Sequence, residues 1–495
     1  MYYFITNRFF KQTSAIELAQ VKRQKIFSML DQESTIVEIE DSFENFDLVN
    51  KLKQLGKLVN MFNYFQKLQV IPKDQETNLI DQIFDGASYT QYGNHFRTDD
   101  KYNNIQVNLK DGRVFYVDYL DHYGFLDRRE YYKFGKLANT EFFSDDARVL
   151  VKQYYDNDHF PIMTFYYRGA DNHQVALTMI RLRYRGHIHS FATVNELISF
   201  FFNCLVEDDK REGKKTSFII DRSVPELNCL SKLDKSIHVT YVFHTLFQDN
   251  GVIRAAYKPI PELIKKGIIN DLICSTEAER RDLIKAFNLD EGQVYAIPVT
   301  YTTNVKRVPF SKRDPNKILL VSRISVEKNV VDAIKAVIEV RKKHPHVYMD
   351  ILGYGDAYNG NKAVNEVNQL IKDANAESYI HLLGFKANIE EYYDTASMQL
   401  LTSKYEGFAM ALLEGQEHGL PGIAYDVKFG PDEIIKDNIT GNIVPYGDLD
   451  KLGKSISSLL KDSSKREKFS KAAYKNSIDF SIKTIANKWK QYFEP

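Results

Sequence analysis

Apolar runs that end in glycine or in a polar loop recur along the second half of the chain. They lie at 317–321, 347–352 and 380–383. Buried strands of this kind favour an α/β domain built on a parallel sheet. Open sheets of this type bind ligands at the carboxyl ends of their strands. The pattern therefore predicts a Rossmann-like domain whose functional residues lie in the loops after the strands.

The same α/β pattern opens the chain and returns after residue 195. The run 2–5 predicts a first strand, 15–30 carries apolar residues at helical spacing, and 36–39 predicts a second strand. These elements indicate a second Rossmann-like domain. Its further strands are expected at 217–221, 238–244 and 271–276.

A block from about 85 to 190 interrupts this pattern. Short aromatic and β-branched runs alternate there with turn signals, among them Asp111-Gly112 and Tyr123-Gly124. Turn signals spaced by roughly ten residues or more favour an antiparallel meander. Asp156-Asn157-Asp158 lies between two such runs. We interpret it as a hairpin turn, and the alternative is the Asp-x-Asp motif of metal-dependent transferases.

Composition narrows the class of protein. A length of 495 residues exceeds one hydrophobic core, so several domains are expected. Equal numbers of basic and acidic residues, 66 of each, give no overall field for nucleic acid. The three cysteines have no metal-site spacing, and no apolar run approaches the length of a membrane span. We expect a cytoplasmic protein, with a peripheral position at the inner face of the membrane as a further possibility.

Two glutamates eight residues apart carry the strongest functional signal. The run 399–403 predicts a buried strand, Gly407 lies in the turn after it, and a helix follows. On one helix, Glu406 and Glu414 would be roughly 80° apart, so they cannot form a catalytic pair on one face. They can reach two ends of a long ligand whose middle lies over the helix N-terminus, which is an anion site. The alternative is a solvated helix face.

A basic pair follows the strand at 317–321. Arg323 and Lys328 are five residues apart, just beyond the strand end. A planar guanidinium and a compact ammonium suit two phosphates, because the first offers a fork of donors and the second a point charge. The alternative is an ordinary surface pair.

Together these motifs resemble the donor site of retaining glycosyltransferases of family 4, which have the GT-B fold. The resemblance is strong over 315–450. It is closest to the branch of poly(glycerol-phosphate) and poly(ribitol-phosphate) glycosyltransferases and of serine-rich adhesin O-glycosyltransferases, with which the chain shares Ser14-Ala15-Ile16-Glu17 and the Gly-Pro-Asp segment at 430–432. The chain departs from the family in having no glycine in the turn after the first strand, where Thr13 and Ser14 lie.

The resemblance implies an α/β fold of two Rossmann-like domains facing a cleft. We expect an N-terminal acceptor-side domain, an inserted β-meander domain, a C-terminal domain that binds the nucleotide sugar, and a last helix that crosses back to the N-terminal domain. These parts are assigned in that order to 1–84 with 191–312, 85–190, 313–475 and 476–495.

The resemblance also assigns roles to individual residues. His244 contacts the donor sugar or stabilises charge at the reacting centre, although its position alone favours a core or capping histidine. Glu406 holds sugar hydroxyls, Glu414 the ribose, and Arg323 with Lys328 the diphosphate. The remaining donor-site residues are Ser322, Gly384 and Phe385 near the uracil, Gly407, Phe408, Ala409 and Met410, with Thr13 and Ser14 in the N-terminal loop and Asp249 and Asn250 on the acceptor side.

The implied activity is transfer of glucose or N-acetylglucosamine from a UDP-sugar to a polymeric acceptor, with retention and without a metal or other cofactor. We favour Ser/Thr of a serine-rich adhesin over a polyol-phosphate (teichoic acid) acceptor, because a polyanion favours a basic protein. A non-catalytic subunit of a glycosyltransferase complex is the alternative from another class. A sugar phosphorylase is disfavoured, since no lysine context for a pyridoxal cofactor is visible. We also expect a homo-oligomer formed through the β insertion.

Overall fold

The computed structural model describes most of the chain, and its contacts define two compact units. Unit 1 comprises 1–24, 32–239 and 263–268, and unit 2 comprises 25–31, 240–262 and 269–495. We describe each unit by itself. The described residues are 1–8, 15–41, 57–68, 79–99, 104–169, 175–222, 229–230, 232–234, 236–249, 251–303, 307–355, 361–386 and 388–494.

Unit 1 contains a parallel sheet with the strand order β3-β2-β1-β14. β1 pairs in parallel with β2 on one side and with β14 on the other. β1, β2 and β14 are almost wholly buried, in keeping with their mostly apolar sequences. The bounds are β1 (Tyr2–Thr6), β2 (Ser34–Glu38), β3 (Leu58–Asn60) and β14 (Ser217–Ile220), with helices α3 (Met61–Gln66), α4 (Leu79–Phe84) and α5 (Val194–Arg211), while α1 (Ala15–Met29) follows β1 in the chain.

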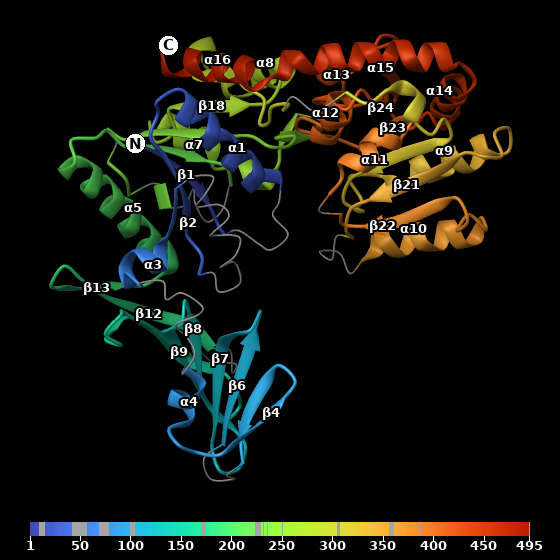
Figure 1. Cartoon of the computed structure of the whole chain (residues 1–495). Coiled ribbons are helices and arrows are strands. Elements are labelled where there is room, and N and C mark those ends of the chain that lie inside the picture. Colours follow the sequence, from blue (N-terminus) through green and yellow to red (C-terminus); the bar gives the residue numbers. More distant parts are fainter. Residues whose placement is uncertain are drawn as a thin grey trace. The chain divides into compact units, whose positions relative to one another are not determined.

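The block between 85 and 190 forms an antiparallel sheet of ten strands in unit 1 (Figure 1). The strands neighbour one another in chain order, so the predicted meander is confirmed. Their bounds are β4 (Tyr89–Tyr92), β5 (His95–Thr98), β6 (Asn104–Lys110), β7 (Arg113–Leu120), β8 (Leu126–Lys133), β9 (Lys136–Phe143), β10 (Val149–Tyr155), β11 (Pro161–Gly169), β12 (Val175–Tyr184) and β13 (His187–Phe191).

Asp156 and Asp158 lie in the hairpin between β10 and β11. The Asp156 carboxylate accepts hydrogen bonds from the amides of Asp158 and Phe160, at 3.0 and 2.9 Å. This is the local bonding that makes aspartate a turn former. The interpretation of this tripeptide as a turn is therefore confirmed.

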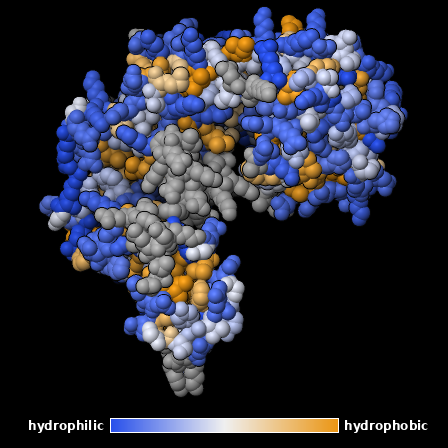
Figure 2. Space-filling view, in the orientation of Figure 1, coloured by the Kyte–Doolittle hydropathy of each residue, from blue (hydrophilic) through white to orange (hydrophobic). Residues whose placement is uncertain are grey.

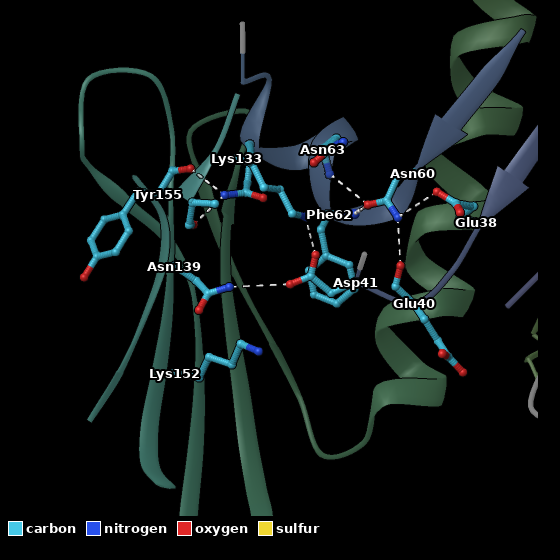
Figure 3. Close-up of polar contacts among 12 residues, drawn as sticks. Glu38, Glu40, Asp41, Asn60, Phe62, Asn63, Lys133, Asn139, Lys152 and Tyr155 are labelled. Carbon is cyan, nitrogen blue, oxygen red and sulfur yellow. Dashed lines mark hydrogen bonds and ion pairs between the residues drawn. The ribbon is translucent and has the colours of Figure 1, made fainter. Parts of the chain in front are cut away.

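A polar junction joins the meander to the parallel sheet of unit 1 (Figure 3). Asp41, just beyond β2, forms an ion pair with Lys133 of β8, and both side chains are nearly buried. Asn60 caps α3 by accepting from the amides of Phe62 and Asn63, at 3.0 and 3.3 Å. The Asp41 carboxylate and the capping oxygen of Asn60 therefore keep their partners in this nearly buried setting.

Unit 2 contains a parallel sheet of six strands in the order β22-β21-β20-β23-β24-β25, with helices around it (Figure 1). Its core is a cluster of aliphatic residues from β20, β21 and α9. The strands are β20 (Lys317–Val321), β21 (Tyr348–Leu352), β22 (Ile380–Gly384), β23 (Met398–Leu401), β24 (Gly422–Asp426) and β25 (Gly441–Pro445). The helices are α9 (Val330–Arg341), α10 (Lys362–Asp373), α11 (Glu390–Thr395), α12 (Met410–Glu417), α13 (Pro431–Ile434), α14 (Leu449–Lys461) and α15 (Ser463–Ser477).

The last helix, α16 (Ile482–Phe493), packs on other parts of unit 2. The hydroxyls of Tyr492 and Thr240 lie 2.6 Å apart, and Trp489 contacts Phe27 with ring centroids 5.0 Å apart. Thr240 and Phe27 both belong to the first half of the sequence, so the C-terminal helix packs against residues from the first half of the chain. The other elements of this part are β15 (His238–Val242), β16 (Gln248–Asp249), β17 (Val252–Ile253), α7 (Ile260–Lys265), β18 (Asp271–Cys274), α8 (Glu277–Phe287) and β19 (Val294–Ala296).

Candidate active site

Glu406 lies in the loop after β23, and its carboxylate has two side-chain donors. Lys328 Nζ donates to Oε1 at 2.7 Å, and Ser403 Oγ donates to the same oxygen at 2.5 Å. Glu406 is only 7% exposed, so the ion pair is shielded from solvent. The structure thus brings together two of the residues predicted for the site. Ser403 was not predicted, although its place three residues before Glu406 is a usable signal.

Main-chain hydrogen bonds fix the position of Glu406. Its amide donates to the carbonyl of Lys428 at 3.1 Å, and its carbonyl accepts from the amide of Phe429 at 3.2 Å. The amide of Lys404 donates to the carbonyl of Glu327 at 2.8 Å, which ties the loop to the segment that carries Lys328. Main-chain hydrogen bonds to two other segments of unit 2 therefore hold the backbone at Glu406 in place.

The loops after β20, β21 and β22 are joined in the same way. The amide of Ser322 donates to the carbonyl of Leu352, and the amide of Gly353 donates to the carbonyl of Gly384, each at 3.0 Å. A Cβ at Gly353 would lie 1.9 Å from the Ser322 carbonyl oxygen. Only glycine permits this close approach, so the glycine that follows β21 reflects contact between neighbouring loops.

His244 lies next to the glutamate motif. A Cβ at Gly407 would lie 2.2 Å from the His244 carbonyl oxygen, so the two backbones are in contact. β15 ends at Val242, two residues before His244, which corrects the expected strand 238–244. The histidine thus lies in the loop beyond the strand and is half-buried.

Arg254 is a site residue that sequence reasoning missed. Its guanidinium donates to Tyr405 Oη at 3.2 Å, lies 4.8 Å from the centre of the Tyr405 ring, and donates to the Leu246 carbonyl at 3.2 Å. No described carboxylate pairs with Arg254. A cation on the segment that follows His244 therefore lies against Tyr405, the residue before Glu406.

Arg323 is the more exposed member of the predicted basic pair. Its side chain is 42% exposed, and it pairs with Glu327 four residues later at 2.8 Å. Lys328 is 21% exposed. Both lie beyond β20, but only Lys328 contacts Glu406 in this structure.

The helix after Gly407, α12, begins at Met410. Ala409 precedes it in the left-handed conformation with φ 59°, and among the described residues no side chain caps this N-terminus. The Phe408 side chain is 3% exposed and packs on Phe480. Of the predicted donor residues here, Phe408 can therefore contact a ligand only through its backbone, whereas the first amides of α12 supply positive potential.

Glu414 lies on α12, four residues after the first residue of the helix. Tyr393 of α11 donates from Oη to Glu414 Oε2 at 3.1 Å. Burial raises the pKa of Tyr393 well above its ordinary value, and the charge of Glu414 adds to this effect. The tyrosine therefore remains a hydrogen-bond donor. No sequence signal pointed to it.

The remaining predicted residues lie at the margins or outside the described chain. Gly384 ends β22, and the Phe385 side chain after it is 55% exposed. Asp249 lies exposed on β16. Thr13, Ser14 and Asn250 lie outside the described residues. Within the described residues, no group of three His, Cys, Asp or Glu side chains is placed to hold a metal ion.

Several charged groups lie on the segments that follow β20 and β23 in unit 2. We refer to them as the strip: the buried carboxylate of Glu406, the cations of Arg323 and Lys328, the uncapped N-terminus of α12, and the second carboxylate, Glu414. Such a strip can hold a neutral polyol by hydrogen bonds to Glu406, an anion by Lys328 and the amides of α12, and a second polyol at Glu414.

Comparison with known proteins gives a consistent result. The family described as Glycosyl transferases group 1 matches residues 302–476. The chain is 24% identical to the poly(glycerol-phosphate) alpha-glucosyltransferase of Bacillus subtilis, over 99% of this chain and 74% of that protein. It is 23% identical to the UDP-N-acetylglucosamine–peptide N-acetylglucosaminyltransferase GtfA subunit of Streptococcus gordonii, over 88% and 85% of the two chains.

A solved structure extends the likeness to the whole chain. The pneumococcal O-GlcNAc transferase GtfA, in complex with UDP and GlcNAc, superposes with a TM-score of 0.82 at 20% identity, over 100% of this chain and 98% of that one. Residues 302–476 thus form a glycosyltransferase group 1 domain, and the chain as a whole has the GT-B fold.

Proposed function

We propose that this protein is a retaining glycosyltransferase that moves glucose or N-acetylglucosamine from a UDP-sugar to hydroxyls of a bacterial surface polymer. The observation that carries the proposal is the buried pair of Lys328 and Glu406 beside the N-terminus of α12. One of the relatives named above is a glucosyltransferase and the other an N-acetylglucosaminyltransferase, so the proposal includes both sugars.

Each part of the strip has a role in this reaction. Glu406 accepts hydrogen bonds from sugar hydroxyls, and Glu414 from the ribose. Arg323, Lys328 and the first amides of α12 neutralise the diphosphate as it leaves, which lowers the barrier because charge develops there. The backbone near Gly384 and Phe385 seats the uracil.

Bond formation and cleavage take place on one face of the sugar. The bond from C1 to the phosphate oxygen breaks, and the acceptor oxygen bonds to C1 through an oxocarbenium-like state. The acceptor proton passes to an oxygen of the leaving phosphate, since none of the described side chains at the strip is placed as an obvious base. His244, against Gly407, stabilises the developing positive charge or holds the sugar.

Two acceptor classes remain. The neutral chain favours Ser/Thr of a serine-rich protein, because a polyanionic acceptor favours a basic protein. Arg254 favours the second candidate, a polyol-phosphate, because its guanidinium has no described carboxylate partner and lies against Tyr405, the residue before Glu406. Asp249 and Asn250 are proposed acceptor contacts in either case.

One experiment tests both the activity and the acceptor. The purified protein is incubated with radiolabelled UDP-glucose or UDP-N-acetylglucosamine, and separately with a serine-rich peptide and with poly(glycerol phosphate). Label transferred to one polymer identifies the acceptor. If no UDP-sugar is hydrolysed or transferred, the enzyme proposal is wrong and the non-catalytic subunit is favoured instead.

We further propose that copies of the chain associate through the inserted sheet. Apolar side chains are exposed there, including Tyr123 at 76%, Phe125 at 57% and Ile188 at 54%. Figure 2 shows apolar surface among polar residues on one face of this sheet. Exposed apolar patches mark interaction sites, and the alternative is an insertion that packs only on its own unit.

A cytoplasmic location, peripheral to the membrane, is part of the proposal. Within the described chain, no helix is both long and apolar enough to cross a bilayer. The last two helices are basic: 463–493 contains eight Lys or Arg and two acidic residues in a chain of net charge zero. Co-sedimentation with anionic vesicles, compared with neutral ones, tests whether this charge brings the enzyme to a membrane.

A further inference from the structure

The side chain of Tyr393 joins α11 to α12 at Glu414. Its hydroxyl donates to Glu414 Oε2 at 3.1 Å and lies 3.4 Å from the carbonyl oxygen of Ala411. The ring is 1% exposed. A buried donor that meets a carboxylate is a strong contact, because water cannot compete for it.

A second contact one helical turn further on fixes the same pair of helices. His418, at the end of α12, lies 2.7 Å from Asp394 through Nδ1, and the Tyr393 ring stacks on the His418 ring with centroids 5.3 Å apart. Glu414 and His418 are four residues apart and so lie on one face of α12. Two consecutive residues of α11 therefore hold α12 at two points.

This arrangement limits the freedom of the Glu414 carboxylate. A glutamate side chain on a helix surface has three rotatable bonds, and a ligand that needs one rotamer must otherwise order them on binding. Tyr393 holds one carboxylate oxygen before the ligand arrives. A tyrosine hydroxyl keeps its proton at neutral pH, and burial raises the pKa of Tyr393 further, so the donor persists.

We infer that Tyr393 is a positioning residue that presets Glu414 for the ribose hydroxyls of the nucleotide. This inference rests on the proposed function, in which Glu414 binds the ribose. Tyr393 itself does not touch the ligand. Its loss should therefore weaken only ligands that carry the hydroxyls Glu414 binds.

Calorimetry with UDP and with its 2′,3′-dideoxy analogue tests this. The wild type should bind UDP more tightly than the analogue. Tyr393→Phe should weaken UDP by about tenfold, as expected for a lost hydrogen bond to a charged group, and leave the analogue unchanged. Tyr392→Phe is the matched control, since this neighbouring tyrosine lies by Lys317 instead and should change neither value. Glu414→Ala should remove the discrimination entirely.

The outcomes separate the inference from the function. If the wild type discriminates and Tyr393→Phe weakens both ligands equally or neither, the inference is overturned and the function stands. A wild type that binds UDP and the analogue equally also overturns it. A wild type that binds no UDP overturns the function itself. If Tyr393→Phe does not fold, Glu414→Asp takes its place, because the shorter side chain draws the carboxylate away from Tyr393. This variant must then weaken UDP and leave the analogue unchanged. If it does not, the inference is overturned.

Discussion

At the residue scale, the buried pair of Glu406 and Lys328 is the most direct target. Glu406→Gln and Lys328→Ala should each lower transfer by about 100-fold or more, because each removes a charge that acts on the reacting sugar or the leaving diphosphate. Initial rates with saturating UDP-sugar measure this. Glu339→Gln, in an exposed ion pair with Lys342, is the control. Near-normal turnover in either site variant, with an unchanged circular dichroism spectrum, would contradict the donor-site assignment.

Glu279 offers a prediction about pH. It lies on α8, is 0% exposed, and burial raises the pKa of Glu279 well above its ordinary value. The folded state therefore holds a proton that the unfolded state loses. The contribution of Glu279 to the free energy of unfolding is full at pH values below the pKa of the unfolded state. As the pH rises from there toward the folded pKa, this contribution is lost by about 1.4 kcal/mol per pH unit.

Glu279→Gln keeps the shape and removes this titration. Urea midpoints measured from pH 5 to pH 8 should fall for the wild type, and less steeply for the variant. Glu277→Gln, in the exposed first turn of the same helix, is the control and should follow the wild type. Parallel curves for the wild type and Glu279→Gln would show that Glu279 is not the group responsible.

The sequence pointed more readily to the residues that we propose face the ligand than to those that support them. Glu406, Lys328 and Gly407 stand out because their types and spacing are dictated by the chemistry of a sugar and a diphosphate. Arg254 and Tyr393 could not be found in this way. Their roles depend on which loops and helices meet in space, and neither residue type is unusual at its position.

At the scale of elements, α12 replaces a metal ion in the proposed mechanism. Its N-terminal amides, with Arg323 and Lys328, supply the positive charge, so transfer should survive EDTA unchanged. Rates measured before and after chelation, with Mg²⁺ or Mn²⁺ added back, check this. Activity that disappears in EDTA and returns with metal would contradict the prediction and would direct attention again to Asp156 and Asp158.

The junction between the meander and the parallel sheet of unit 1 is a second element-scale target. Lys133→Ala leaves the Asp41 carboxylate without its cation in a nearly buried position. Removing one partner of a buried ion pair costs about 3–5 kcal/mol. Limited proteolysis should cut the inserted sheet faster, and the thermal midpoint should fall. Lys136→Ala, across the same hairpin turn, should behave as the wild type, and equal behaviour of the two variants would show that the ion pair is not needed.

Element boundaries show where sequence reasoning stops. The meander and its turns were predictable because aspartate and glycine fix each turn locally, as Asp156 does with the amides of Asp158 and Phe160. Not every strand end was predictable. β21 ends at Leu352 as expected, whereas β15 stops at Val242 although the apolar Phe243 follows, because the register with β18 and not hydrophobicity sets where the strand ends.

At the scale of the whole molecule, the GT-B fold was implied by the resemblance of the motifs to glycosyltransferases of family 4. The division into domains at 84, 190, 312 and 475 stays a prediction. So does the oligomer, because exposed apolar residues identify a surface without identifying the copy that covers it.

The last prediction concerns the inserted sheet as a whole. A variant in which a short Gly/Ser linker replaces 85–190 should still hydrolyse UDP-sugar, because every proposed donor contact apart from the N-terminal loop lies beyond residue 240. It should lose self-association and polymer affinity, since the exposed aromatic residues go with the block. Sedimentation velocity and polymer binding measure these losses.

The double variant Tyr123→Asp with Phe125→Asp in the full chain is a milder change that leaves the junction at Asp41 intact. If the variant keeps its oligomeric state and its polymer affinity, the insertion has neither role. If it stays folded and no longer binds UDP, the donor site includes residues of the insertion, and the strip at Glu406 is only part of it.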